Sequence, residues 1–187
     1  MAWGWHFSSF LAGLIVLASI GLTHTRAEAK AFYSKPEALA LAFPDADTVE
    51  NHTFFLTDEQ VKQIEALAQT TVDSKLVTIY TGRKGEQVLG YALIDTHIVR
   101  TLPETFLIVL APDGTVRKLH VLAFYEPQEY LPSARWLRQF EQKTLNLDLR
   151  LQRDIHGIAG ATLSARAVTS GVRKALALFQ VLIQQRQ

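Results

Sequence analysis

The chain has 187 residues, a formal net charge of +1 at pH 7 and no cysteine. With 48% hydrophobic and 20% charged residues, it has the balance of one globular domain with a substantial core plus a short extra segment. The near-neutral charge gives no electrostatic footprint for binding nucleic acid. The lack of cysteine excludes disulfides, thiolate catalysis, iron–sulfur clusters and c-type haem, so redox chemistry would need another cofactor.

The start of the chain is predicted to direct export or membrane anchoring. Residues 10–22 (FLAGLIVLASIGL) form an uncharged apolar run. Its length suits the core of a signal peptide better than a membrane span, which needs about 20 residues. Residues 27–31 then offer two overlapping A-x-A patterns for cleavage, whereas the Trp residues ahead of the run suit an uncleaved anchor. We expect a signal peptide or anchor helix over residues 1–31, followed by an extracytoplasmic domain; a buried helix of a soluble domain is the alternative.

Short helices and one strand are expected in the next part of the chain. Residues 36–43 (PEALALAF) predict a short helix with Pro in its first turn, and a strand is expected within 48–56. Thr57 and Gln60 match the two ends of a capping box, which predicts that a second helix begins there.

The middle of the chain is rich in strand patterns. Turn signals at 82–85 (GRKG) and 112–114 (PDG) separate them. Short connections of this kind predict antiparallel hairpins. The expected strands cover residues 76–80, 88–94, 106–110 and 116–124.

The last part of the chain alternates between helix and strand patterns. Residues 133–142 are expected to be helical, and 145–151 (LNLDLRL) alternate as an edge strand would. A long amphipathic helix is expected from about 164 to 183, with Arg166, Arg173 and Lys174 on its polar face. The whole pattern predicts an α+β fold, a central antiparallel β-sheet with flanking helices.

A nearly bare segment, His156-Gly157-Ile158-Ala159-Gly160-Ala161-Thr162-Leu163-Ser164, precedes the last helix. Its glycines and alanines let a large group approach the backbone closely. A helix N-terminus presents unpaired N–H groups and a positive dipole end, which favour a phosphate. A phosphate near Thr162 is therefore physically sensible, and a simple Ser/Thr N-cap after a loop is the alternative.

The run from Gly160 to Ser164 (GATLS), followed by Arg-Ala-Val, resembles the flavinylation site of the FMN-binding domain family. That family includes flavin-carrying components of the sodium-pumping NADH:quinone oxidoreductase and of Rnf-type complexes. The resemblance implies that FMN is the cofactor, that Thr162 is esterified to its phosphate by a flavin transferase, and that Gly160, Ala161, Leu163 and Ser164 border it. Residues 32–187 would form the FMN-binding domain.

Two positions differ from the family pattern, Asp-x-x-[Ser/Thr]-Gly-Ala-Thr-x-[Ser/Thr]. His156 stands at the Asp and Ala159 at the first Ser/Thr. Because it lies in the motif, His156 is a candidate for contact with the flavin or its phosphate, with a plain loop histidine as the alternative. The six histidines show no spacing typical of a metal site.

The loop that begins at Tyr125-Glu126-Pro127 is the expected neighbour of the flavin ring. A phosphoester fixes only one end of the cofactor, so the flat ring needs an apolar cleft elsewhere. In the family a Glu-Thr-Pro-Gly loop borders the flavin, and Glu126-Pro127 resembles it. We therefore expect Tyr125, Glu126 and the segment up to Phe140 to lie against the ring; a purely structural role for Trp136 and Phe140 is the alternative.

The resulting hypothesis is an extracytoplasmic electron-transfer flavoprotein, either periplasmic or anchored to the inner membrane. Its expected partners are a flavin transferase and a membrane-bound oxidoreductase with quinone-linked or cytochrome redox partners. The sequence has no NAD(P)H-binding fingerprint, so electrons would arrive from another protein. A flavin-free scaffold module of the same fold and an enzyme that reduces an external acceptor directly are the alternatives.

Overall fold

The computed structural model describes Met1, residues 30–99 and residues 101–186. Its centre is a six-stranded sheet with the order β1-β6-β5-β4-β3-β2, in which all neighbours are antiparallel. This confirms the α+β class. The strands are β1 (Lys30–Ala31), β2 (Thr48–Phe55), β3 (Leu76–Lys84), β4 (Gln87–Val99), β5 (Leu102–Leu110) and β6 (Val116–Phe124).

The expected hairpins are confirmed, but β4 and β5 are longer than their apolar runs. The ladder between them continues through polar pairs such as Thr96↔Thr105 and His97↔Glu104. The two threonine hydroxyls lie 3.1 Å apart and can share a hydrogen bond across the strands. Cross-strand contacts of this kind stabilise a ladder where apolar burial ends.

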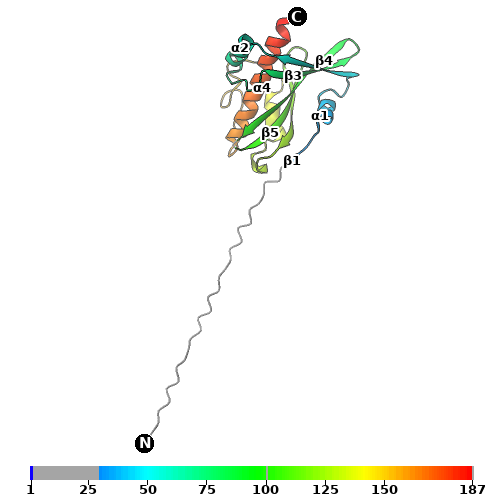
Figure 1. The fold of residues 1–187 in the computed structure, drawn as a ribbon. Helices are drawn as coiled ribbons and strands as arrows, with labels where there is room; N and C mark the ends of the chain where they lie inside the picture. The colour runs from blue at the N-terminus through cyan, green and yellow to red at the C-terminus, as the bar shows by residue number, and fades with distance from the viewer. Residues whose placement is uncertain (2–29, 100, 187) are drawn as a thin grey trace.

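Helices cover both faces of the sheet (Figure 1). On one face lie α2 (Asp58–Ala68) and the long α4 (Thr162–Leu182), and on the other lies α1 (Lys35–Ala42). Strand β5 serves both layers, because alternate side chains point to opposite faces. Phe106 and Ile108 pack in the core beneath α4, whereas Leu107 and Val109 pack in the core with α1.

The capping box predicted for α2 is present. Thr57 Oγ accepts a hydrogen bond from the Gln60 backbone N–H at 3.2 Å, and the Gln60 side chain accepts one from the Thr57 N–H at 3.0 Å. Two N–H groups at the helix N-terminus are thereby satisfied.

In the last part of the chain, one expected helix is shorter than predicted and one expected strand is absent from the described residues. The helix expected over 133–142 is one turn of α3 (Ala134–Leu137) followed by the 3-10 turn η2 (Arg138–Phe140). Residues 145–151 form turns rather than a strand, with one isolated bridge at Leu151. The cause is Asn146, whose Oδ1 accepts from the N–H groups of Asp148 and Leu149 at 2.7 and 2.9 Å and so removes both from any ladder.

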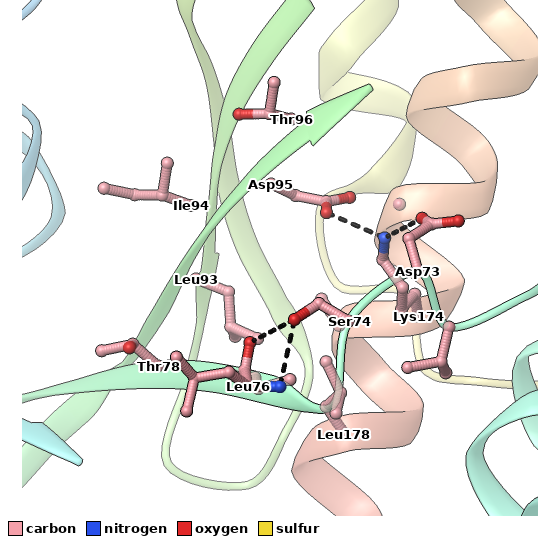
Figure 2. A pocket seen from close by; sticks show the side chains of 14 residues that line it. Asp73, Ser74, Leu76, Thr78, Leu93, Ile94, Asp95, Thr96, Lys174 and Leu178 are labelled. Carbon is pink, nitrogen blue, oxygen red and sulfur yellow. Dashed lines mark hydrogen bonds and ion pairs between the residues drawn. The ribbon is translucent and has the colours of Figure 1, made fainter. Parts of the chain in front are cut away.

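Lys174, in the middle of α4, forms ion pairs with Asp95 on β4 and Asp73 in the loop after α2 (Figure 2). Its Nζ lies 3.0 Å from Asp95 Oδ1 on β4 and 3.6 Å from Asp73 Oδ2, in the loop after α2. His97 Nε2 lies 2.7 Å from the other oxygen of Asp95. Although burial acts to raise it, the pKa of Asp95 is lowered by the hydrogen bond and charge of His97 and by the charge of Lys174. The cation of Lys174 is therefore neutralised within the protein.

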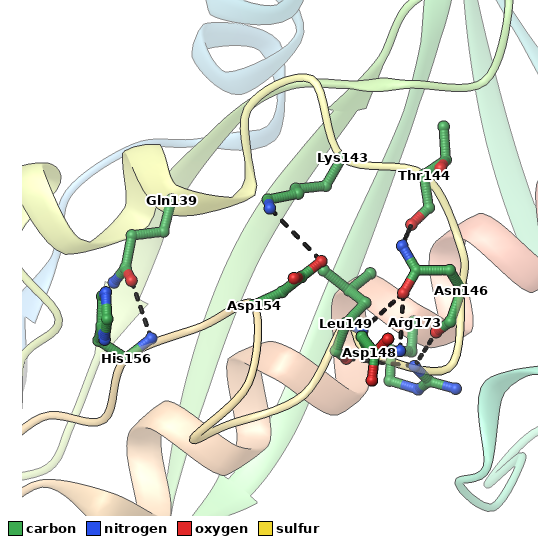
Figure 3. A network of polar contacts seen from close by, with 9 residues as sticks. All are labelled: Gln139, Lys143, Thr144, Asn146, Asp148, Leu149, Asp154, His156 and Arg173. Atoms are coloured by element: carbon green, nitrogen blue, oxygen red, sulfur yellow. Dashed lines mark hydrogen bonds and ion pairs between the residues drawn. The ribbon is translucent and has the colours of Figure 1, made fainter.

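Arg173 lies on the same face of the last helix as Arg166, as expected, but there the end of α2 and the turns around Asn146 and Leu149 cover that face. The side chain is only 4% exposed and donates to the carbonyls at the end of α2, Ala68 O at 2.6 Å and Leu67 O at 3.1 Å. It also donates to Asn146 O at 2.8 Å and Leu149 O at 3.1 Å, as Figure 3 shows in part. The last carbonyls of a helix lack intrahelical partners and carry partial negative charge, which favours a cation there.

The predicted signal peptide or anchor falls almost entirely on residues outside the described part of the chain. Among the helices that are described, none combines the length and hydropathy needed to cross a membrane.

We predict that Arg173→Met lowers the free energy of unfolding by about 3 kcal/mol or more, because buried carbonyls of two segments lose their donor. Urea denaturation of the full chain measures the change. Arg166→Gln is the matched control on the same helix, since Arg166 is exposed, and should change stability by no more than about 0.5 kcal/mol. Equal stability of the two variants would contradict the role given to Arg173.

Candidate functional site

The loop before α4 brings the bare motif to the surface. Gly160 has φ 78°, a left-handed conformation that side chains other than glycine adopt with strain, and no atom lies within 4 Å of the place a Cβ would take. The N-cap of α4 is Ala161, which makes no side-chain cap. The alternative reading of Thr162 as an N-cap is therefore wrong, since Thr162 is the first residue of the helix.

The two hydroxyls of the motif differ in their surroundings. Thr162 is exposed, and the structure records no hydrogen bond from its hydroxyl to any described residue. Ser164 is 2% exposed, and its Oγ donates to Glu104 Oε1 at 2.7 Å. Only the Thr162 hydroxyl is free to form a bond with another molecule.

A cavity of about 160 Å³ lies directly at Thr162. Six of the candidate residues from the sequence analysis line this cavity. One of them, Glu126, is separated from the other five in the sequence by α3, η2 and the turns that follow. Tyr130, from the segment expected to lie against the flavin, also lines the cavity, and the structure adds Val99. The predicted residues that line the cavity are Glu126, Gly160, Ala161, Thr162, Leu163 and Ser164.

Tyr125 and His156 do not line this cavity. The N–H of Tyr125 donates to Pro103 O at 3.2 Å, which continues the ladder between β5 and β6 past its last pair. The backbone of His156 is held by Gln139 Oε1, which accepts from its N–H at 2.9 Å, and by Trp136 Nε1, which donates to its carbonyl at 2.7 Å. The contact proposed between the His156 ring and the flavin stays a prediction.

The segment after Glu126 divides between the cavity and the core. Tyr130 reaches the cavity wall, whereas Trp136 and Phe140 are 8% and 0% exposed and pack edge to face beneath the helix layer. Their burial in the core agrees with the purely structural alternative for these two rings.

A buried carboxyl lies under the first turn of α4, and sequence reasoning missed it. Glu104 is 0% exposed and sits on the same side of β5 as Phe106 and Ile108, beneath α4. Its Oε2 has no hydrogen-bond partner among the described residues. The available signal was a Glu at an inward-facing position of an otherwise apolar strand.

The surroundings of Glu104 favour its protonated form. Burial raises the pKa of its carboxyl above the ordinary value; the hydrogen bond from Ser164 and the charge of His97 oppose this, and the charge of Glu126 adds to it. Glu126 itself is 5% exposed and accepts from the N–H of Leu102 at 3.2 Å. Two carboxyl groups thus lie on the sheet side of Thr162.

A second hollow, of about 200 Å³, lies between α4 and the strands at Asp95 and Lys174 (Figure 2). It contains none of the site residues expected from the sequence. Its single cation, Lys174, is paired with both Asp73 and Asp95, so the hollow offers no unpaired positive charge to a phosphate.

Comparison with known proteins identifies the region that carries the motif. Residues 103–177 match the model of the FMN-binding domain family. The match assigns this part of the chain to the FMN-binding domain family. The match runs from β5 through α4 and includes Thr162, Glu104 and Glu126. The match does not test the predicted domain boundary at residue 32 or the resemblance to components of particular redox complexes. Both stay predictions. No curated protein matches the chain.

FMN is the cofactor of this domain, and the residues at Thr162 fit such a group. A free hydroxyl stands at the N-terminus of a helix, where N–H groups favour phosphate. The open backbone at Gly160 leaves room for a close approach. Among the described residues, no cluster of side chains could hold a metal ion.

We predict that Glu104→Gln removes a pH dependence of stability in the FMN-binding domain. Because the folded-state pKa of Glu104 is raised, the folded protein binds more protons than the unfolded chain above the ordinary pKa of 4.5. The stabilising effect of its protonation is fully present below that value and is lost as pH rises through the folded pKa. Glutamine cannot ionise but keeps an oxygen that accepts from Ser164.

Urea denaturation of wild type and Glu104→Gln between about pH 4 and pH 8 measures this effect. The wild type should lose stability relative to the variant as pH rises. Glu104→Ala, which leaves the Ser164 hydroxyl unsatisfied, should cost about 1–3 kcal/mol at every pH. Parallel pH curves for wild type and Glu104→Gln would contradict the raised pKa.

Proposed function

We propose that FMN is bound covalently through a phosphoester to Thr162 and that the domain relays electrons. One observation carries the choice of residue: of the two hydroxyls of the motif, Thr162 is exposed and unbonded, whereas Ser164 is buried and donates to Glu104. The position of Thr162 in the first turn of α4 adds the N–H groups and dipole that suit a phosphate.

The attachment is a phosphoryl transfer from FAD, catalysed by a flavin transferase. A bond forms between Thr162 Oγ and the FMN phosphorus, while the bond from that phosphorus to the bridging oxygen of the diphosphate breaks. AMP leaves with the electron pair, and the hydroxyl proton passes to a base of the transferase. Thr162 must therefore be accessible, as its exposure and its place at a cavity rim allow.

Covalent attachment suits work outside the cytoplasm. Free FMN is dilute there, and occupancy of a reversible site depends on ligand concentration relative to Kd. An ester bond removes that dependence. FMN supplies one- and two-electron transfer, while the protein positions it and tunes its potential through nearby charges such as Glu126.

The electron partners are proposed to be a membrane-bound oxidoreductase and quinone-linked or cytochrome acceptors. The basis is the absence of an NAD(P)H fingerprint in the sequence together with the apolar run at 10–22. With the run exported or anchored, the domain lies on the extracytoplasmic side of the membrane, periplasmic or held to the inner membrane.

We predict that coexpression with a flavin transferase raises the mass of the protein by that of FMN less one water, and that Thr162→Ala abolishes the increase. Intact-mass spectrometry and flavin colour after denaturation measure it. Thr144→Ala removes an exposed threonine distant from the cavity and should be modified like wild type. An unmodified wild type would end the covalent proposal and favour reversible FMN binding.

We predict that a C-terminal fusion to a reporter active only in the cytoplasm is silent, because residues 1–31 carry the domain across the membrane. The same fusion lacking residues 1–31 is the control and should be active. Strong cytoplasmic activity of the full-length fusion would contradict the extracytoplasmic placement.

A further inference from the structure

A second recess begins at Thr162 and runs along α4 on the side away from Glu104. Its volume is about 350 Å³, and its walls are α4, Gln69 at the end of α2 and the turn at 150–152. Along α4 it follows Thr162, Arg166, Ser170 and Arg173, which recur at three- to four-residue spacing and so share one face of the helix. Thr162 therefore separates two cavities.

The charges that line this recess are all positive. They are the guanidinium groups of Arg150, Arg166 and Arg173, and no Asp or Glu lines it. Among the described residues, none of the three forms an ion pair with a carboxylate. Elsewhere on the surface the arginines Arg83 and Arg153 do pair with a carboxylate.

The guanidinium groups of Arg150 and Arg173 are close enough to repel each other. Arg173 has only carbonyl partners, and Arg150 donates to the side-chain oxygen of Gln69, which is neutral. Burial, with the nearby charge of Arg150, lowers the pKa of Arg173. A like-charge cluster with only neutral partners is stabilised when an anion enters it.

The electrostatic potential therefore differs between the two sides of Thr162. On one side lie the carboxyl groups of Glu104 and Glu126, and on the other lie the guanidinium groups of the recess. A phosphate bonded to Thr162 Oγ keeps one negative charge as a diester. Attraction to the guanidinium groups and repulsion from the carboxylate of Glu126 both favour that charge on the arginine side.

We propose that this recess is an anion site in which Arg166 and Arg150 bind the phosphate joined to Thr162 and, before attachment, the diphosphate of the incoming FAD. The inference rests on the proposed attachment at Thr162 for its use, but the anion site itself is a property of the unmodified chain. Arg166 lies one helical turn from Thr162, and a guanidinium presents paired N–H donors that match two phosphate oxygens. Arg173, already bonded to four carbonyls, contributes charge.

The first test measures binding of inorganic pyrophosphate to the full chain made without a flavin transferase, by titration calorimetry at constant ionic strength. Wild type should bind, and the double variant Arg150→Gln/Arg166→Gln should bind at least about tenfold more weakly, since each charged hydrogen bond contributes about that factor. Arg153→Gln is the matched control, because Arg153 is exposed and paired with Asp148 outside the recess. Equal affinity of the double variant and Arg153→Gln would overturn the anion site.

The second test uses the attached cofactor to identify which phosphate the recess serves. Flavinylated wild type should lose pyrophosphate binding, because its own phosphodiester occupies the recess. Retained affinity would assign the site to a separate phosphate compound and overturn the proposed role. With limiting transferase and FAD, the double variant should be flavinylated about tenfold more slowly than Arg153→Gln, and equal rates would also overturn that role.

The two proposals fail in different ways. If wild type is never flavinylated, the covalent link to Thr162 is lost whatever the pyrophosphate titration gives. If wild type is flavinylated but pyrophosphate affinity is unchanged by the two substitutions, the link stands and the arginine recess is lost.

Discussion

The buried guanidinium of Arg173, on α4, joins two other backbone segments to that helix. It satisfies carbonyls at the end of α2 and in the turns around Asn146 and Leu149, and it belongs to α4. These hydrogen bonds, together with the apolar side chains of α4 in the core, determine the position of α4 against α2 and the sheet. Since Thr162 is the first residue of that helix, the same contacts determine where its hydroxyl stands.

Around that hydroxyl the structure separates opposite charges. The sheet contributes Glu104, whose burial favours the protonated form, and the loop after β6 contributes Glu126. The outer face of α4 contributes guanidinium groups with no carboxylate partner in the part of the chain that is described. A phosphate is favoured by cationic surroundings. Thr162 lies between a cavity lined by Glu126 and a recess lined by arginines, so only the second of these offers such surroundings.

Local patterns predicted the local structure well. The capping box at Thr57 and the turn signals between strands rest on hydrogen bonds and backbone angles within a few residues, and the structure confirms them. The same logic failed at 145–151, where alternation suggested a strand. There the side chain of Asn146 accepts hydrogen bonds from the amides that a ladder would need.

By itself, the sequence determined the α+β class, the order of the hairpins, and a flavin-type motif at the start of a long helix. It could not show that Arg173 is buried, that Ser164 is bonded to Glu104, or that Glu126 lies at Thr162. Amphipathic periodicity assigns Arg173 to the polar face of the helix, but whether that face is exposed or buried depends on α2, which is distant in the chain. Tertiary structure decided these points, because burial and the pairing of polar groups depend on segments that meet only when the chain folds.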